Sequence, residues 1–161
     1  MKIIKNIFSE ECCDDIFNKI NNTIPINENK KKEDWWLWSV WSSSIDNSQN
    51  SILIKNEIEE KIKLKLNTDH FNVSWVQMTQ YDSNRYLRKH LDGGNNETLI
   101  ILLSDDFVGG DLLLDDIKID LNKGDAIFFS GYKIYHEVTK VTSGFRRALI
   151  VWYKLKSKTL I

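Results

Sequence analysis

The feature that most limits the possible folds is a series of short β-type segments that fills the C-terminal half of the chain. From about residue 71 onward, β-branched and aromatic residues gather in short runs, and Asp-Gly, Gly-Gly and Lys-Gly-Asp turns lie between the runs. Strands repeating at roughly 10–15 residues are typical of antiparallel sandwiches and jelly rolls. The expected strands cover residues 73–78, 98–103, 110–114, 126–129, 135–138 and 145–153.

Two amphipathic helices are expected ahead of this β region. Ser9 has the character of an N-cap followed by acidic residues, and apolar residues then recur at helical spacing over 9–21 and again over 51–66. The expected class is therefore mainly β with N-terminal helices (α+β), in a jelly-roll arrangement. Without an internal repeat or a linker, one domain over residues 1–161 is the simplest assignment, with its core at about 71–155.

A tryptophan-rich stretch at residues 35–41 does not fit an ordinary exposed strand. In a strand, alternate residues point to opposite faces, and here both faces are strongly apolar. One face is expected to pack in the core. The other could contact a substrate by packing on a peptide or by stacking on a base, so the role of this stretch stays open.

Charge and cysteine content exclude several classes of partner and location. The 22 basic and 23 acidic residues give a formal net charge of -1, which offers no general attraction to nucleic acid or to an anionic membrane. Cys12 and Cys13 are adjacent and cannot cross-link distant segments. Neither a signal peptide nor an apolar run of about 20 residues occurs, so a cytoplasmic protein is expected. Nothing in the pattern indicates an oligomeric state.

Two histidines and one aspartate are candidates for a metal site. His90 and Asp92 lie two residues apart, so in an extended segment both side chains leave the same face. His136 lies at the start of a later expected strand. Two imidazoles and one carboxylate form the facial triad that holds non-haem Fe(II) and leaves coordination positions open.

Arg146 adds a second candidate function. Strand alternation places Arg146 on the same face as Ala148, Ile150 and Trp152, so its guanidinium is expected to point into an apolar interior. A buried arginine needs an anion, and a ligand carboxylate held by the planar guanidinium is a suitable partner. A dicarboxylate such as 2-oxoglutarate could chelate iron at one end and pair with Arg146 at the other.

These motifs together resemble those of the Fe(II)/2-oxoglutarate-dependent oxygenases, most closely the prolyl 4-hydroxylase-like group. The resemblance covers about residues 75–153. It rests on an ordered set of segments: Gln80-Tyr81, His90-Leu91-Asp92, residues 98–104, Phe107-Val108-Gly109-Gly110-Asp111-Leu112, residues 123–129, His136-Glu137-Val138 and residues 141–152 with Gly144-Phe145-Arg146.

The resemblance implies a double-stranded β-helix that uses Fe(II), 2-oxoglutarate and O2, and it leaves open whether ascorbate is needed. The resemblance implies that His90, Asp92 and His136 bind the iron and that Arg146 binds the distal carboxylate of the co-substrate. It also implies that Tyr81 and Thr98 contact the co-substrate and that Trp152 lies near the substrate.

The implied activity is hydroxylation of a C–H bond, with a prolyl residue of a peptide or protein as the leading substrate. Two alternatives stay open. One is an oxygenase acting on a nucleobase or small molecule, favoured by the tryptophan-rich stretch and the local run Lys30-Lys31-Lys32, but disfavoured by the overall charge. The other is a non-catalytic jelly-roll binding module that keeps its metal for structure.

Overall fold

A computed structural model describes residues 1–27, 35–94 and 96–157 of the chain. They form two helices and twelve strands. In chain order these are β1 (Lys2–Ile4), α1 (Glu10–Thr23), β2 (Trp36–Ser42), α2 (Gln49–Lys63), β3 (Phe71–Tyr81), β4 (Leu87–His90), β5 (Glu97–Leu102), β6 (Phe107–Gly109), β7 (Leu112–Leu114), β8 (Ile117–Ile119), β9 (Ala126–Phe129), β10 (His136–Val138), β11 (Val141–Gly144) and β12 (Arg146–Leu155).

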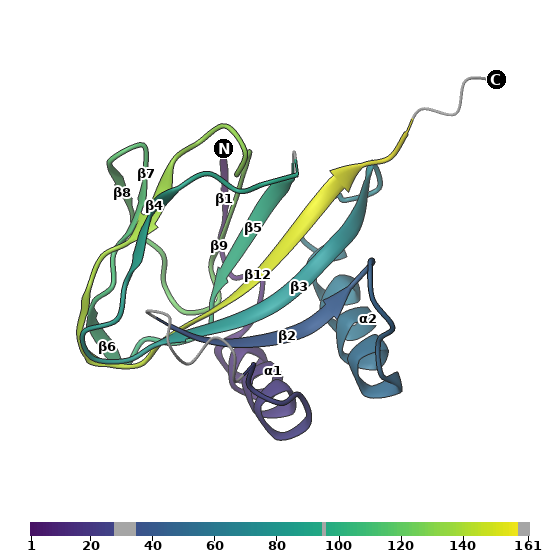
Figure 1. Ribbon diagram of the computed structural model, residues 1–161, viewed down its shortest axis with the longest axis horizontal. Helices are drawn as coiled ribbons and strands as arrows, with labels where there is room; N and C mark the ends of the chain where they lie inside the picture. Colours follow the sequence, from purple (N-terminus) through teal and green to yellow (C-terminus); the bar gives the residue numbers. More distant parts are fainter. Residues whose placement is uncertain (28–34, 95, 158–161) are drawn as a thin grey trace.

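The strands form a major sheet, a minor sheet and a two-stranded ribbon. The major sheet has the order β1-β9-β5-β12-β3-β2, the minor sheet the order β4-β10-β7-β8, and β11 pairs with β6. Every pairing is antiparallel, and the chain passes repeatedly from one sheet to the other. This is the double-stranded β-helix expected from the sequence, with the two sheets facing each other across a gap (Figure 1).

Both helices lie against the outer face of the major sheet (Figure 1). Ser9 caps α1 by accepting a hydrogen bond from the Cys12 backbone N–H at 3.0 Å, as the sequence predicts, and Ser48 caps α2 in the same way. The apolar stripe of each helix is buried against the sheet, and it consists of Cys13, Ile16, Ile20, Ile54, Ile58 and Ile62. Neither helix has the length and hydropathy needed to cross a membrane.

The interior strand β12 separates two apolar clusters because its residues alternate between the two faces of the major sheet. Leu149, Val151 and Tyr153 pack toward the helices. Ala148 and Ile150 belong to the second cluster, between the two sheets. The inner face of β12 therefore forms one wall of the interior of the barrel.

The tryptophan-rich stretch forms β2, an edge strand of the major sheet, with a bulge between Ser39 and Trp41. Trp38 and Val40 are buried in the cluster that faces the helices. Trp35, just before β2, packs with the cluster between the sheets. The stretch thus contributes to both sides of the major sheet, as its two apolar faces indicate. The lysine run at 30–32 lies outside the described residues.

Candidate metal centre

His90, Asp92 and His136 converge although they come from different parts of the minor sheet. His90 ends β4, His136 begins β10, and the two residues are paired across these antiparallel strands. Asp92 follows β4, where its backbone N–H donates to the Gly131 carbonyl at 2.9 Å. One potential ligand atom from each residue lies within 4.8 Å of the others. The geometry therefore brings together the three residues that the sequence selects.

Each histidine is oriented by a backbone carbonyl two residues earlier. His90 Nδ1 lies 2.8 Å from the Arg88 oxygen, and His136 Nδ1 lies 2.9 Å from the Ile134 oxygen. When Nδ1–H donates to these carbonyls, both Nε2 atoms carry the lone pair and face the cluster. A backbone carbonyl that fixes the tautomer and ring orientation in this way is typical of metal-ligating histidines.

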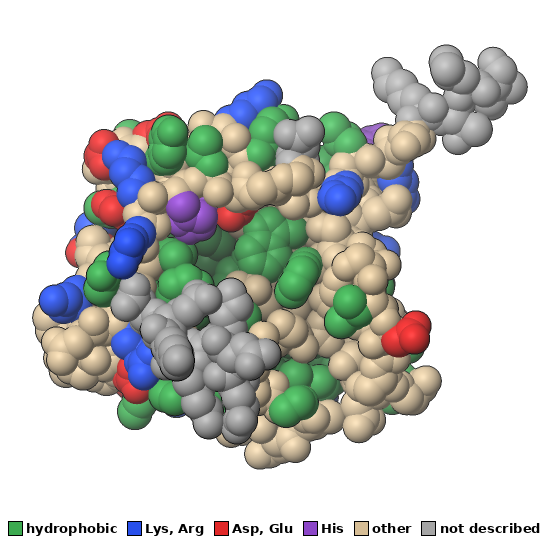
Figure 2. All heavy atoms as spheres, in the orientation of Figure 1, with side chains coloured by type: hydrophobic (Ala, Val, Ile, Leu, Met, Phe, Trp, Pro, Cys, Tyr) green, Lys and Arg blue, Asp and Glu red, His purple; other side chains and the backbone are tan. Residues whose placement is uncertain are grey.

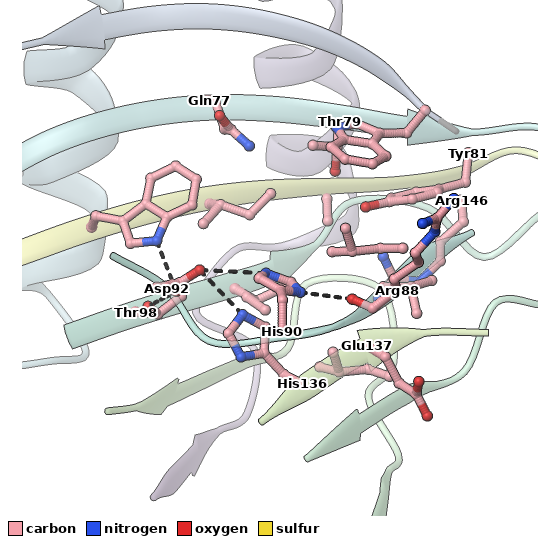
Figure 3. Close-up of a pocket in the computed structure, with 18 residues that line it drawn as sticks. Gln77, Thr79, Tyr81, Arg88, His90, Asp92, Thr98, His136, Glu137 and Arg146 are labelled. Atoms are coloured by element: carbon pink, nitrogen blue, oxygen red, sulfur yellow. Dashed lines mark hydrogen bonds and ion pairs between the residues drawn. The ribbon is translucent and has the colours of Figure 1, made fainter. Parts of the chain in front are cut away.

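The Asp92 carboxylate has two differently used oxygens (Figure 3). Oδ1 lies 3.3 Å from His136 Nε2 and 3.5 Å from His90 Nε2. Oδ2 accepts hydrogen bonds from Thr98 Oγ1 at 2.6 Å and from Trp152 Nε1 at 2.9 Å. The two donors hold Oδ2, so Oδ1 alone is free to face a metal together with the imidazoles.

The same contacts determine the charge of the cluster. Burial raises the pKa of Asp92, but the contacts with the imidazoles of His136 and His90 and the hydrogen bond from Thr98 outweigh it and hold the pKa well below its usual range. The pKa of His90 is raised, chiefly by Asp92. The site therefore keeps a carboxylate anion next to two imidazoles, which is the donor set of a facial triad for a divalent transition metal.

Gly131 lets this carboxylate lie where it does. A Cβ at this position would be only 2.2 Å from both Asp92 Oδ2 and Thr98 Oγ1. At Gly93, which follows Asp92 in the chain, a Cβ would have no other atom within 4 Å. Gly131 is thus a functional residue that sequence reasoning missed, because its importance depends on a contact between segments far apart in the chain.

The cluster lies at the edge of a cavity of about 660 Å³ between the two sheets. Figure 2 shows the hollow on this face, with hydrophobic side chains gathered inside it. Its apolar lining consists of Leu87, Ile100, Leu112, Val138, Ala148 and Ile150, together with the rings of Trp35, Tyr81 and Trp152.

Arg146 lies inside this cavity, at the other end from the metal cluster in the close-up view (Figure 3). Its side chain is 3% exposed, and its Nε has no hydrogen-bond partner among the residues that the structure describes. Burial lowers its pKa, and no carboxylate of the described residues forms an ion pair with it. Gly110 provides the space for it, since a Cβ there would be 2.9 Å from Arg146 Cδ. A buried cation without an anion is what a carboxylate ligand would complete.

Tyr81 lies beside Arg146, as its direct partner across β3 and β12. The guanidinium carbon is 5.8 Å from the Tyr81 ring centre, and Trp35 stacks on the ring from another side at 6.2 Å. Burial raises the pKa of Tyr81 to about 12, so its hydroxyl stays protonated at neutral pH. Tyr81 therefore lies close to where a ligand of Arg146 would bind.

The seven residues selected from the sequence thus line one cavity, although their immediate partners differ. Thr98 and Trp152 both donate to Asp92, which gives them a part in orienting this carboxylate. The co-substrate contact expected of Thr98 and the substrate contact expected of Trp152 remain predictions. The third histidine, His70, lies in an exposed turn away from the cluster.

Comparison with known proteins agrees with this architecture. Residues 76–154 match the model of the 2OG-Fe(II) oxygenase superfamily. Among curated proteins, none matches the chain by sequence. Several solved structures share the fold at low sequence identity.

Three of these structures illustrate the similarity. An oxidoreductase of the 2OG-Fe(II) oxygenase family from Burkholderia pseudomallei has a TM-score of 0.73 at 16% identity, over 93% of this chain and 81% of that one. A viral collagen prolyl hydroxylase from Paramecium bursaria Chlorella virus-1 has a TM-score of 0.65 at 19% identity, over 97% and 96%. A prolyl hydroxylase from Trichoplax adhaerens, in complex with a hypoxia inducible factor peptide, has a TM-score of 0.64 at 16% identity, over 94% and 82%.

Proposed function

Because residues 76–154 belong to the 2OG-Fe(II) oxygenase superfamily, we propose that this enzyme hydroxylates a C–H bond of a peptide or protein, with a prolyl residue as the leading target. Fe(II) and 2-oxoglutarate are the cofactor and co-substrate of this family. The proposed ligands of the iron are the Nε2 atoms of His90 and His136 and the Oδ1 atom of Asp92, all of which face one point.

The observation that carries the proposal is the buried Arg146, which pairs with no anion in the described part of the chain and lies in the same cavity as the His-Asp-His cluster. A metal that served only the structure would need no guanidinium in an apolar pocket beside it. A dicarboxylate explains both features, because one carboxylate pairs with Arg146 while the other end reaches the metal.

The residues of the chain have separate tasks in this scheme. When bound, Fe(II) and 2-oxoglutarate supply the oxidising power, because O2 and the 2-oxo acid are converted to succinate and CO2 as one oxygen atom enters the substrate C–H bond. Arg146 fixes the co-substrate by charge, and the apolar walls exclude water from the reacting atoms. Thr98 and Trp152 hold Asp92 so that it offers a single oxygen to the metal.

Two of the similar structures support a peptide or protein substrate, since they are a collagen prolyl hydroxylase and a prolyl hydroxylase in complex with a peptide. The near-neutral charge of the chain also favours a peptide over a nucleic acid. No feature of the described residues specifically favours a nucleobase. We therefore treat oxidation of a nucleobase or small molecule, and a complete absence of turnover, as alternative results of the experiment described next.

The test is succinate formation from 2-oxoglutarate with Fe(II) and O2, with and without ascorbate, alongside mass spectrometry of proline-containing peptides for the addition of one oxygen atom. We expect peptide-dependent succinate formation. His90→Ala, Asp92→Ala and His136→Ala should abolish it, and Arg146→Lys should raise the concentration of 2-oxoglutarate required.

A binding measurement separates catalysis from a purely structural metal. Adding 2-oxoglutarate without O2 to the Fe(II)-loaded protein should change its visible absorption spectrum, because the co-substrate enters open coordination positions. An unchanged spectrum, or unchanged turnover in the three alanine variants, would contradict the proposed function. His70→Ala, at the histidine in an exposed turn away from the cluster, serves as the matched control.

A further inference from the structure

A second cavity adjoins the first on the inner face of the major sheet. It has a volume of about 550 Å³, and it shares Gln77, Asp92 and Trp152 with the cavity that holds Arg146. In Figure 1, β12, β3 and β2 extend beyond the region that the minor sheet covers, and residues of these three strands line the second cavity. We call this second cavity the side groove.

Serine and asparagine side chains make up much of the lining of the side groove, together with the apolar surfaces of Leu37, Trp75 and Trp152. Its lining includes Asn27, Ser39, Ser42, Ser43, Ser44, Ser74, Trp75, Asn96 and Lys154 in addition to the three shared residues. Several of these side chains hydrogen-bond within the protein: Ser42 with Ser44, and Ser74 with Asn96. These side chains are therefore satisfied within the protein and form the wall of the groove.

Other groups in the groove have no hydrogen bond of their own in the described part of the chain. The Gln77 carboxamide points from β3 into the interior (Figure 3), and it lies where the two cavities meet. Ser39 on β2, which pairs directly with Gln77, also lines the groove, and its hydroxyl likewise has no hydrogen bond within the described residues. An amide and a hydroxyl can each donate and accept, which matches the N–H and C=O groups of a peptide backbone.

Trp75 provides an apolar contact in the same groove. Its side chain is 39% exposed, an unusual exposure for a tryptophan in a central strand, and its ring packs edge-on against Trp152 with centres 6.5 Å apart. Trp152 in turn donates to Asp92. A ligand that covers Trp75 therefore extends directly to the metal cluster.

Lys154 decides the charge of the expected ligand. Among the described residues, Lys154 and Asp92 are the charged residues that line the groove, and the Asp92 carboxylate is already held by Thr98 and Trp152. Lys154 is exposed and forms no ion pair within the described residues. The groove thus offers one unpaired positive charge, and an acidic group on the ligand is its complement.

We propose that the side groove binds the segment that flanks the hydroxylated residue of an extended peptide, and that it selects an acidic side chain there through Lys154. The proposal rests on the proposed function, since it places the target residue of the peptide in the first cavity. Trp75 supports the flanking segment, and Gln77 holds its backbone at the junction. Lys154 is then a determinant of specificity that does not touch the reacting atoms.

The test is a charge reversal measured on matched peptides. Proline-centred peptides that differ only in carrying Glu, Ala or Lys at the flanking positions are compared by kcat/KM with wild type and with Lys154→Glu. Wild type should favour the Glu peptides over the Lys peptides by about two- to fivefold at low ionic strength, as for an exposed ion pair. Lys154→Glu should reverse this order, Lys154→Gln should abolish the preference, and added salt should reduce it.

Lys2→Glu is the control for net charge, because Lys2 is exposed on β1, at the opposite edge of the major sheet from β2. It should leave the preference unchanged. Gln77→Ala should raise KM for all three peptide types with little change in kcat, whereas a purely structural role would lower thermal stability without this split.

The outcomes separate this inference from the proposed function. If peptides are hydroxylated equally whatever their flanking charge, and Lys154→Glu behaves as wild type, the inference is overturned while the proposed function stands. If the enzyme forms succinate but oxidises none of the peptides and instead oxidises a single-stranded oligonucleotide or a neutral oligosaccharide, both are overturned.

Discussion

Replacing Gly131 by alanine should weaken metal binding although Gly131 is not a ligand. The added methyl carbon would lie 2.2 Å from both Asp92 Oδ2 and Thr98 Oγ1. Carbon and oxygen atoms in ordinary contact are more than 3 Å apart, so each oxygen has to move by about 1 Å. The hydrogen bond of 2.6 Å between them cannot survive this movement intact.

The magnitude follows from what that hydrogen bond does. Disturbing a support of a metal ligand typically lowers metal affinity by about 10–100-fold. Losing a buried hydrogen bond to a charged group costs about 1.5–3 kcal/mol of folding free energy, which a domain of this size tolerates. We therefore expect Gly131→Ala to fold, with a modest loss of stability and a large loss of metal affinity.

The assay is anaerobic isothermal titration with Fe(II), repeated in air with Mn(II), together with thermal unfolding of the metal-free protein. Gly93→Ala is the matched control, since it adds the same methyl group next to Asp92 in open space. Neither glycine has a left-handed backbone, so neither substitution adds backbone strain. If Gly131→Ala binds metal as tightly as Gly93→Ala, the reasoning about Asp92 is wrong.

Three further predictions concern single contacts. Thr98→Val, which replaces the hydroxyl by a methyl group, should weaken metal binding about tenfold by titration, whereas Thr98→Ser should restore it. In the absence of 2-oxoglutarate, Arg146→Met should raise the free energy of unfolding by about 1–4 kcal/mol, because it removes a buried charge that is unpaired within the described residues. The same variant should abolish the increase in melting temperature that 2-oxoglutarate causes in wild type. Burial raises the pKa of Asp125, but hydrogen bonds from Lys5 and two backbone N–H groups outweigh it and lower the pKa below its usual 3.8. The ionised form of Asp125 therefore stabilises the fold above that pH, and this contribution is lost on acidification. Denaturation at a series of pH values should show Asp125→Asn to be less stable at neutral pH and less sensitive to acid; an acid sensitivity equal to that of wild type would contradict this.

The sequence predicts well those parts of the structure that depend on local spacing. The cap at Ser9 and the inward face of β12 follow from helix and strand periodicity. The two-residue spacing of His90 and Asp92 likewise predicts that both side chains point the same way. Each of these depends on residues close together in the chain, whose relative positions the backbone geometry fixes.

What the sequence does not predict depends on contacts between distant segments. Sequence periodicity does not predict strand β1, since its three residues become a strand only by pairing with β9. The short strands β4, β6, β8 and β11 were missed for the same reason, because none has a long enough pattern of its own. The importance of Gly131 is visible only once the fold places it next to Asp92. The importance of Lys154 is visible only once the fold places it in the side groove.

One strand, β12, connects the proposed co-substrate site, the candidate metal cluster and the proposed substrate contact. Arg146, Trp152 and Lys154 lie on its inner face, and at about 3.3 Å per residue they are spread over about 26 Å. A shift of the strand by one residue would turn all three toward the helices, so the pairing of β12 with β3 and β5 sets the geometry of every site at once. Because the apolar residues Leu149, Val151 and Tyr153 occupy the opposite face, burial of the core enforces the register that the chemistry requires. The same burial that stabilises the fold thereby holds the proposed catalytic and specificity residues in line.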